Sequence, residues 1–225
     1  GCLWRVSVSR PSHSSRPPQR RRETRLPLDP SHLAQRGLSL EGHPSLATVR
    51  LKSPTRSPTI FRKRIADTGS TARHGDLVRV LADDDSLVGY GLWNPRAEAA
   101  VRLLSRGEQP PDENWWLSRL DEAIQLRHRL LQVERGTDAY RVIHAEGDGL
   151  PGLVADRYAD VLSLEVFSLG MFQRAEALAT ALAARLAVPH WIVRPGPQTA
   201  EQEGFIAEGF QSGRAPEKVR IQEHG

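Results

Sequence analysis

Apolar and polar side chains alternate in four short segments between residues 47 and 105, and alternation of this kind predicts β-strands. The second and third segments are separated by Asp-Asp-Asp-Ser, a turn composition, so we expect them to form a hairpin. Residues 57–66 (SPTIFRKRIA) are expected to form a turn and then a short helix or irregular segment. Four short strands within about 60 residues favour a small barrel or curled sheet. The four segments are 47–52, 76–83, 87–93 and 99–105.

A second pattern follows the stretch GEQPPDE, whose residues 107–111 are interpreted as a linker. Residues 113–133 carry apolar side chains at near-helical spacing, which predicts an amphipathic helix that Asp112 can cap. Within it, the adjacent Trp115 and Trp116 are expected to anchor the core, with base stacking as the alternative. A second helix is predicted around 171–186. The remaining strand-like runs, which together predict an α+β unit around a small sheet, are 140–146, 153–159, 161–168, 190–195 and 218–225.

The run HAEGDGLPGLVAD contains Gly147, Gly149 and Gly152 at the spacing of a dinucleotide-binding turn. Such a turn must open a helix whose first N–H groups face the pyrophosphate. Here Pro151 has no N–H to offer, and the residues after Gly152 have a strand pattern. We therefore expect a turn between antiparallel strands and no nucleotide site.

Charge divides the chain into a basic first third and an acidic remainder. Residues 1–75 hold 15 Lys/Arg against 4 Asp/Glu, whereas residues 76–225 hold 16 against 23. Residues 1–46 are rich in Arg, Ser and Pro without periodicity, so they are expected to form a disordered tail. The imbalance suggests a polyanion partner reached through the N-terminal part, but for residues 1–46 the favoured interpretation is a solvated tail with no partner.

The ordered part of the basic third contains seven cations that face only Asp67 among the acids of residues 47–75. Because Lys and Arg side chains neutralise phosphates, we predict that this set contacts RNA, an idle solvated face being the alternative. The set consists of Arg50, Lys52, Arg56, Arg62, Lys63, Arg64 and Arg73.

Other chemistry has weak support in the sequence. Cys2 is the only cysteine and no histidines stand at metal-ligand spacing, so neither a disulfide nor a metal site is expected. No apolar run approaches the ~18 residues of a membrane helix, and we expect a cytoplasmic protein with no membrane partner. Three titratable side chains alternate along one strand end and suggest acid–base catalysis: His144, Glu146 and Asp148. The favoured interpretation is structural, with the carboxylates bonding turn amides or pairing with Arg141 or Arg157.

The run YRVIHAEGDGLPGLVADRY closely resembles a signature of the large-subunit ribosomal RNA methyltransferase I family, and VGYGLWNPRAEAAVRLLS resembles the hairpin and Asn-Pro turn of its first domain. The resemblance implies an RNA-binding PUA domain, a central α+β domain and a Rossmann-like methyltransferase domain. It places a PUA-like barrel at residues 47–106 and the central domain at 112–215. Residues 216–225 would begin the connection to the methyltransferase domain. Where the family has His-Pro-Trp-x-Phe, this chain has Ser57-Pro58-Thr59-Ile60-Phe61, which weakens the expectation of unaltered RNA recognition.

The resemblance also implies an activity: methylation of cytosine C5 in 23S rRNA with S-adenosylmethionine. That reaction needs an activated cysteine and a glycine-rich cofactor turn. Cys2 lies in the predicted tail, and no such turn remains once the glycine run is excluded. We therefore expect an α+β chain without a Rossmann-like methyltransferase domain, with no catalytic or cofactor-binding residues, that binds ribosomal RNA and is inactive alone. Two alternatives stay open: a fragment of a full-length active methyltransferase, and a degenerate remnant with a structural or assembly role. Oligomeric state is not indicated by the sequence.

Overall fold

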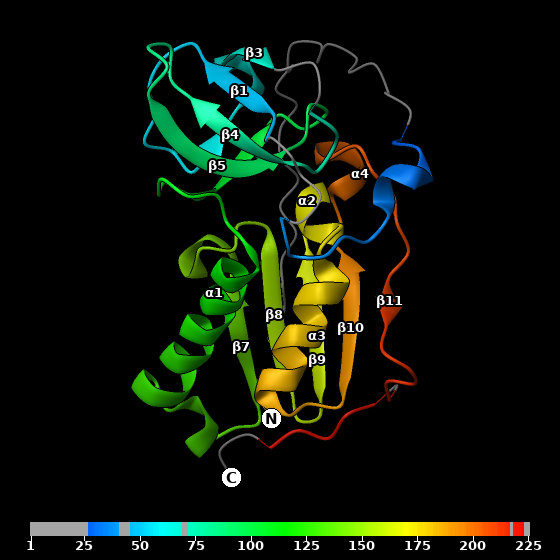
Figure 1. Cartoon of the computed structure of the whole chain (residues 1–225). Coiled ribbons are helices and arrows are strands. Elements are labelled where there is room, and N and C mark those ends of the chain that lie inside the picture. Colours follow the sequence, from blue (N-terminus) through cyan, green and yellow to red (C-terminus); the bar gives the residue numbers. More distant parts are fainter. Residues whose placement is uncertain (1–26, 41–45, 69–71, 217, 223–225) are drawn as a thin grey trace, which may run out of the picture.

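The computed structural model describes residues 27–40, 46–68, 72–216 and 218–222. These residues form two sheets, one above the other in Figure 1, joined through α2, α4 and the segment 27–40. The upper sheet curls into a small unit, which we call the barrel. The lower sheet carries two long helices on one face, and together they form what we call the lower unit.

The upper sheet has six strands in the order β2-β6-β5-β4-β1-β3. Its neighbours are antiparallel except for β1 and β4, which are parallel. Period-two alternation places Val49 and Leu51 in the core, fully buried, and turns Arg50 outward. The four strands predicted here are confirmed, and residues 57–66 contribute two more strands around a 3-10 turn at Arg62–Arg64. The strands are β1 Thr48–Leu51, β2 Thr59–Ile60, β3 Ile65–Thr68, β4 Leu77–Leu81, β5 Leu87–Trp93 and β6 Val101–Ser105.

The lower sheet has five strands in the order β11-β10-β9-β8-β7. β7, β8 and β9 form an antiparallel meander, whereas β9 and β10 are parallel and connected through α2 and α3. The strand expected at 218–225 is not formed by 218–222, and residues 223–225 lie outside the described part. The edge beside β10 is instead paired with the two-residue β11. The strands are β7 Ala139–His144, β8 Leu153–Tyr158, β9 Val161–Val166, β10 His190–Pro195 and β11 Phe210–Gln211.

Two amphipathic helices, α1 (Glu113–Gln125) and α3 (Ala175–Leu186), lie side by side against the lower sheet. The cap predicted for α1 is confirmed, because the Asp112 carboxylate accepts a 2.8 Å hydrogen bond from the Trp115 N–H. Trp116 is buried in the core, as expected, and Trp115 packs partly buried beside it. The chain continues from α1 into a π-helical turn at Leu126–Leu130. The predicted second helix is broken after α2 (Leu169–Phe172), and α4 (Thr199–Gln202) is a single turn.

The two units are joined by the buried carboxylate of Glu203, which is 1% exposed. One of its oxygens accepts from Arg102 on β6 at 2.9 Å, and the other accepts from the Asn94 amide at 2.9 Å. The latter oxygen also accepts from the N–H of Leu169 at the start of α2, at 3.2 Å. A buried charge is stable only when it is paired and hydrogen-bonded. This carboxylate therefore fixes the barrel against the lower unit.

Residues 27–40 pack into the same joint, although composition assigned them to a disordered tail. Leu28 and Leu38 are buried, and the Leu28 N–H donates to the carbonyl of Gly204. The Arg36 guanidinium pairs with Asp76 at 2.5 Å, and the Gln35 amide donates to the carbonyl of Phe172. The segment includes a 3-10 turn at Pro30–Leu33. Its order comes from these long-range contacts, which local periodicity cannot indicate.

Two side chains in this joint have lowered pKa values. Burial, and then the neighbouring His32, lower the pKa of His74 from its ordinary value. Burial lowers the pKa of Arg174 to about 10, which leaves its guanidinium charged at neutral pH. Arg174 donates to the carbonyls of Gly75 in the barrel and Gly170 in α2, so it is a second polar link between the units.

Replacing Glu203 tests this joint. We expect Glu203→Ala to lower the free energy of unfolding by about 3–5 kcal/mol, because Arg102 would stay largely buried without its partner. Urea denaturation measures the change. Glu208→Ala removes a carboxylate from an exposed position and should change stability by no more than about 0.5 kcal/mol. Equal effects of the two substitutions would contradict the assigned role of Glu203.

Candidate functional site

The seven predicted RNA-contacting cations divide into two groups in the structure. Arg50 pairs with Asp85, and Arg62 pairs with Glu98 at 2.5 Å. Both carboxylates come from beyond the window 47–75 in which the sequence showed only Asp67. The other five side chains are exposed and pair with no carboxylate among the described residues; they are Lys52, Arg56, Lys63, Arg64 and Arg73.

Four of these five cations gather around the loop 52–58. The Lys52 N–H donates to the carbonyl of Arg64, and the Arg64 guanidinium donates to the carbonyl of Pro54. Arg56 lies in the loop itself, and Lys63 precedes Arg64 in the 3-10 turn. Arg73 lies in the turn before β4, where its N–H donates to Asp76. We call the loop 52–58 with Lys63 and Arg64 the basic loop.

Arg106 was not among the predicted RNA-contacting residues, but its side chain lies against the basic loop. Its guanidinium is exposed and donates to the carbonyls of Thr55 and Ser57 at 3.4 and 3.3 Å. Because Arg106 is distant in sequence, the charge count of residues 47–75 could not include it. The only available signal was its position directly after the predicted strand 99–105.

The hydroxyl group of Ser57 forms two hydrogen bonds at the end of the basic loop. The Ser57 Oγ donates to the carbonyl of Thr59 at 2.8 Å and accepts from the Thr59 N–H at 3.2 Å. This pair of bonds fixes the turn that leads into β2.

A small groove of about 250 Å³ runs between the basic loop and the lower unit. The barrel contributes Pro58, Arg106 and the end of β6, and the lower unit contributes residues from the glycine run. Its walls therefore come from both sides of the joint that Glu203 fixes. The full lining is Pro58, Leu103, Leu104, Ser105, Arg106, Glu146, Gly149 and Pro151.

The glycine run forms a turn, as predicted, between the antiparallel strands β7 and β8. A 3-10 turn at Ala145–Asp148 ends at Gly149, whose φ is +70°, and Gly152 follows with φ +86°. Residue 153 then begins β8 and not a helix. The run therefore lacks the helix N-terminus that binds a pyrophosphate.

Asp148 has a structural role in this turn. Its carboxylate accepts from the backbone N–H of His144 at 2.6 Å, which agrees with the expected bond to a turn amide. Its ionic partner is Arg127, through two bonds of 2.5 and 2.8 Å, and neither Arg141 nor Arg157. Arg141 pairs with Asp156, and Arg157 donates to Glu134. The Glu146 carboxylate makes no bond with any described residue and lines the groove.

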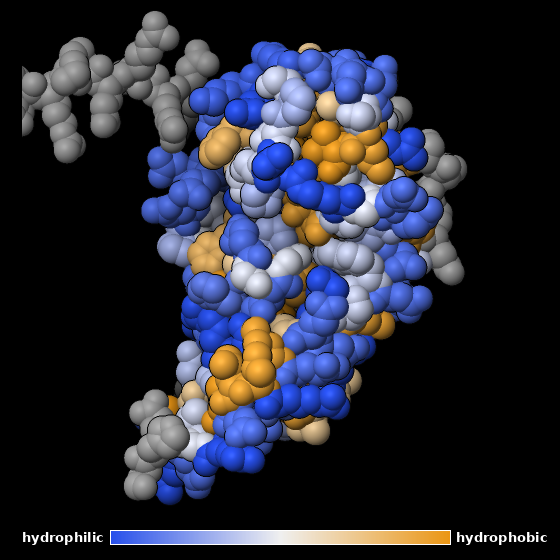
Figure 2. Space-filling model, turned by 90° about the vertical axis from the view of Figure 1, so that its left-hand side faces the viewer, coloured by the Kyte–Doolittle hydropathy of each residue, from blue (hydrophilic) through white to orange (hydrophobic). Residues whose placement is uncertain are grey.

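An apolar patch lies at the end of the molecule remote from the barrel. Leu126, Leu130 and Leu131, in and just after the π-helical turn, are 37%, 74% and 58% exposed. In the view of Figure 2, one area of apolar surface lies in the lower half of the molecule and another lies in the upper half. Exposed apolar patches on helices are typical of contact surfaces between proteins.

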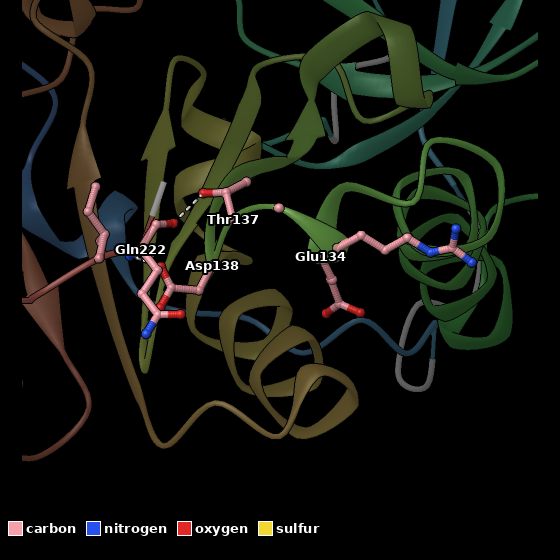
Figure 3. Close-up of a pocket in the computed structure, with 7 residues that line it drawn as sticks. Glu134, Thr137, Asp138 and Gln222 are labelled. Carbon is pink, nitrogen blue, oxygen red and sulfur yellow. Dashed lines mark hydrogen bonds between the residues drawn. The ribbon is translucent and has the colours of Figure 1, made fainter. Parts of the chain in front are cut away.

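A second hollow, drawn in Figure 3, lies between the turn 134–138 and the segment 221–222. The Gln222 N–H donates to the Asp138 carboxylate at 2.7 Å, and the Thr137 hydroxyl donates to the Gln222 carbonyl at 2.8 Å. Its charged lining residues are Glu134, Asp138 and Arg135, two carboxylates against one guanidinium, so the hollow suits a polyanion less well than the basic loop does.

Within the described residues, no group of three or more His, Cys, Asp or Glu side chains could hold a metal ion. The helices among those residues are also too short or too polar to cross a membrane.

Comparison with known proteins relates this chain to ribosomal RNA methyltransferases. A family model described as a PUA-like domain matches residues 52–106. A ribosomal RNA large subunit methyltransferase I from Alteromonas mediterranea is 29% identical over 170 residues, which cover 75% of this chain and 43% of that protein. One from Shewanella denitrificans is 32% identical over 174 residues, covering 76% and 44%. The chain thus spans less than half the length of these relatives. Its upper unit is similar to a PUA-like domain, and these relatives are named for the methylation of ribosomal RNA.

Two solved structures share the fold. A protein from Streptococcus mutans assigned as a SAM-dependent methyltransferase matches with a TM-score of 0.62 and 13% identity, over 79% of this chain and 46% of its own. A second, SMU.776, assigned as a methyltransferase and solved with SAH, matches with a TM-score of 0.54 and 15% identity, over 69% and 39%. Both identities are low, so the likeness concerns the fold.

These structures correct the predicted fold class. We expected an α+β chain with no Rossmann-like methyltransferase domain, and that exclusion is wrong, because the fold matches are methyltransferases with a mixed sheet. The exclusion rested on the absence of a second glycine-rich turn. It overlooked that β9, α2–α3 and β10 form a parallel crossover, the unit from which Rossmann-like sheets are built.

In such sheets a cofactor lies beyond the carboxyl ends of the parallel strands. Here that position follows β9, where the Ser168 hydroxyl accepts from the Met171 N–H and Glu203 accepts from the Leu169 N–H. All four residues of α2 are buried, and a Cβ at Gly170 would lie 2.9 Å from Leu92 of the barrel. The barrel fills this place, so the described residues there do not fit S-adenosylmethionine.

The glycine turn gives a test that separates its two interpretations. We expect Gly147→Ala to change stability by no more than about 0.5 kcal/mol, because the added Cβ meets only His144, at 3.5 Å. Gly152→Ala should cost about 1–3 kcal/mol, since φ is +86° and the Cβ would lie 2.9 Å from the Ser168 Oγ. Chemical denaturation of both variants makes the comparison. The reverse order of effects would rule out the turn as described.

Proposed function

We propose that this chain is the RNA-recognition part of a ribosomal RNA large subunit methyltransferase I-like protein, and that the basic loop contacts the RNA. The observation that carries the proposal is the clustering of cations without carboxylate partners on a PUA-like domain. The relatives named for ribosomal RNA methylation support the choice of RNA as the polyanion.

The electrostatics of the basic loop favour a phosphate backbone as its partner. Lys52, Arg56, Lys63 and Arg64 are exposed, so a polyanion can reach them without breaking an ion pair. Each phosphate that they neutralise would release condensed counterions, which gives an affinity that falls with salt. Arg50 and Arg62 would contribute less than the sequence alone suggested, because Asp85 and Glu98 already neutralise them.

The name of the relatives also suggests which reaction the RNA contact serves. For the family that the sequence resembles, that reaction is the methylation of cytosine C5 of 23S rRNA with S-adenosylmethionine, and the residues described here would serve it by holding the RNA. The PUA-like unit is proposed to span residues 47–106 and the central unit 112–215, with residues 216–225 as the connection that follows. A cytoplasmic setting, where ribosomal RNA is available, belongs to the same proposal.

Salt dependence tests the RNA contact. Binding of a fluorescein-labelled large-subunit rRNA hairpin is measured by anisotropy between about 50 and 200 mM salt. Substituting Lys52, Lys63 and Arg64 together with Ala should reduce the slope of log affinity against log salt by about 2–3, since three phosphate contacts are lost.

A matched control removes the same charge elsewhere. Arg129, Arg135 and Arg214 are exposed in the lower unit, and their combined replacement with Ala should leave the slope within about 0.5 of the original. An equal reduction in both triple variants would show that only net charge matters. Absence of binding by the unaltered chain at low salt would refute the proposed function.

A further inference from the structure

The groove beside the basic loop has the size and position of a site for a single base. RNA held by Arg56 would pass directly over it, because Arg106 binds the carbonyls on both sides of Arg56 and also lines the groove. A hollow of about 250 Å³ is too small for a duplex but can receive one unstacked base. Proteins that recognise RNA sequence read splayed, single-stranded bases in this way.

The walls of the groove suit the faces of a planar base. Pro58 and Leu103 lie on the barrel side, and Pro151 lies on the side of the glycine run. Arg119 borders the run from α1, where a Cβ at Gly149 would lie 3.5 Å from its Cδ atom. A base entering here would lose water from its faces while its edges met the polar atoms of the lining.

Glu146 is the acidic residue of this lining, and its position favours one kind of base edge. A carboxylate repels phosphates, so it weakens a surface that serves only to hold an RNA backbone. A carboxylate has only acceptors, and its partners on bases are N–H groups, such as the amino group of cytosine. The Glu146 carboxylate is exposed and makes no bond with any described residue, so it is free to accept one.

From this arrangement we infer that the groove binds one unstacked RNA base bearing an exocyclic amino group, which Glu146 reads while the basic loop holds the flanking phosphates. The inference rests on the proposed function and specifies how the RNA lies on the joint between the two units. It also gives the glycine run a role: Gly149 and Pro151 shape a wall of the groove.

The test compares two single-stranded RNA nonamers, one of adenosine and one of purine riboside, which differ only by the amino group. Anisotropy at low salt should show the unaltered chain binding the adenosine nonamer about fivefold to tenfold more tightly, the range expected for a hydrogen bond to a charged acceptor that is partly exposed. Glu146→Ala should bring the two affinities within about twofold, because it removes the acceptor for the amino group.

Glu208→Ala is the matched control, since it makes the same change at an exposed site next to β11, at the opposite edge of the lower sheet from β7. It should retain the full preference for adenosine. Equal affinity of the unaltered chain for the two nonamers, or a preference that survives Glu146→Ala, would overturn the inference while leaving RNA binding intact. Failure to bind either nonamer or the rRNA hairpin would instead refute the proposed function.

Discussion

The buried carboxylate of Glu203 is the constraint on which the rest of the structure depends. It joins a barrel strand through Arg102, the Asn-Pro turn through Asn94 and the start of α2 through the Leu169 N–H. Because the Glu203 side chain is only 1% exposed, the loss of one of these partners would strongly lower the free energy of unfolding. The barrel and the lower sheet therefore share one fixed orientation, which Arg174 and residues 27–40 reinforce.

This orientation brings together groups that lie far apart in the sequence. Arg106 reaches back to the loop at Thr55 and Ser57, and the glycine run approaches the end of β6. The basic loop alone could only hold a phosphate backbone. The groove beneath it, which exists because the joint is rigid, adds a place where a base can be read. Backbone contacts position an RNA and base contacts specify it, and here the two kinds of surface adjoin.

The sequence predicted those features that depend on local patterns. Alternation located the strands of the barrel, and Asp112 marked the start of α1. The turn chemistry of Gly149 and Pro151 correctly indicated a link between antiparallel strands. Features set by distant contacts were missed: the order of residues 27–40, the neutralisation of Arg50 by Asp85, and the contribution of Arg106. The parallel crossover between β9 and β10 was also missed, because strand direction is not encoded in periodicity.

Cross-linking of RNA to the chain tests the central claim most directly. A large-subunit rRNA hairpin containing 4-thiouridine is irradiated with the chain, and the modified peptides are mapped by mass spectrometry. Adducts are expected to concentrate in residues 52–64 and 103–106, around the basic loop and the groove. Adducts concentrated instead in residues 126–138, at the apolar patch and the acidic hollow, would contradict that claim.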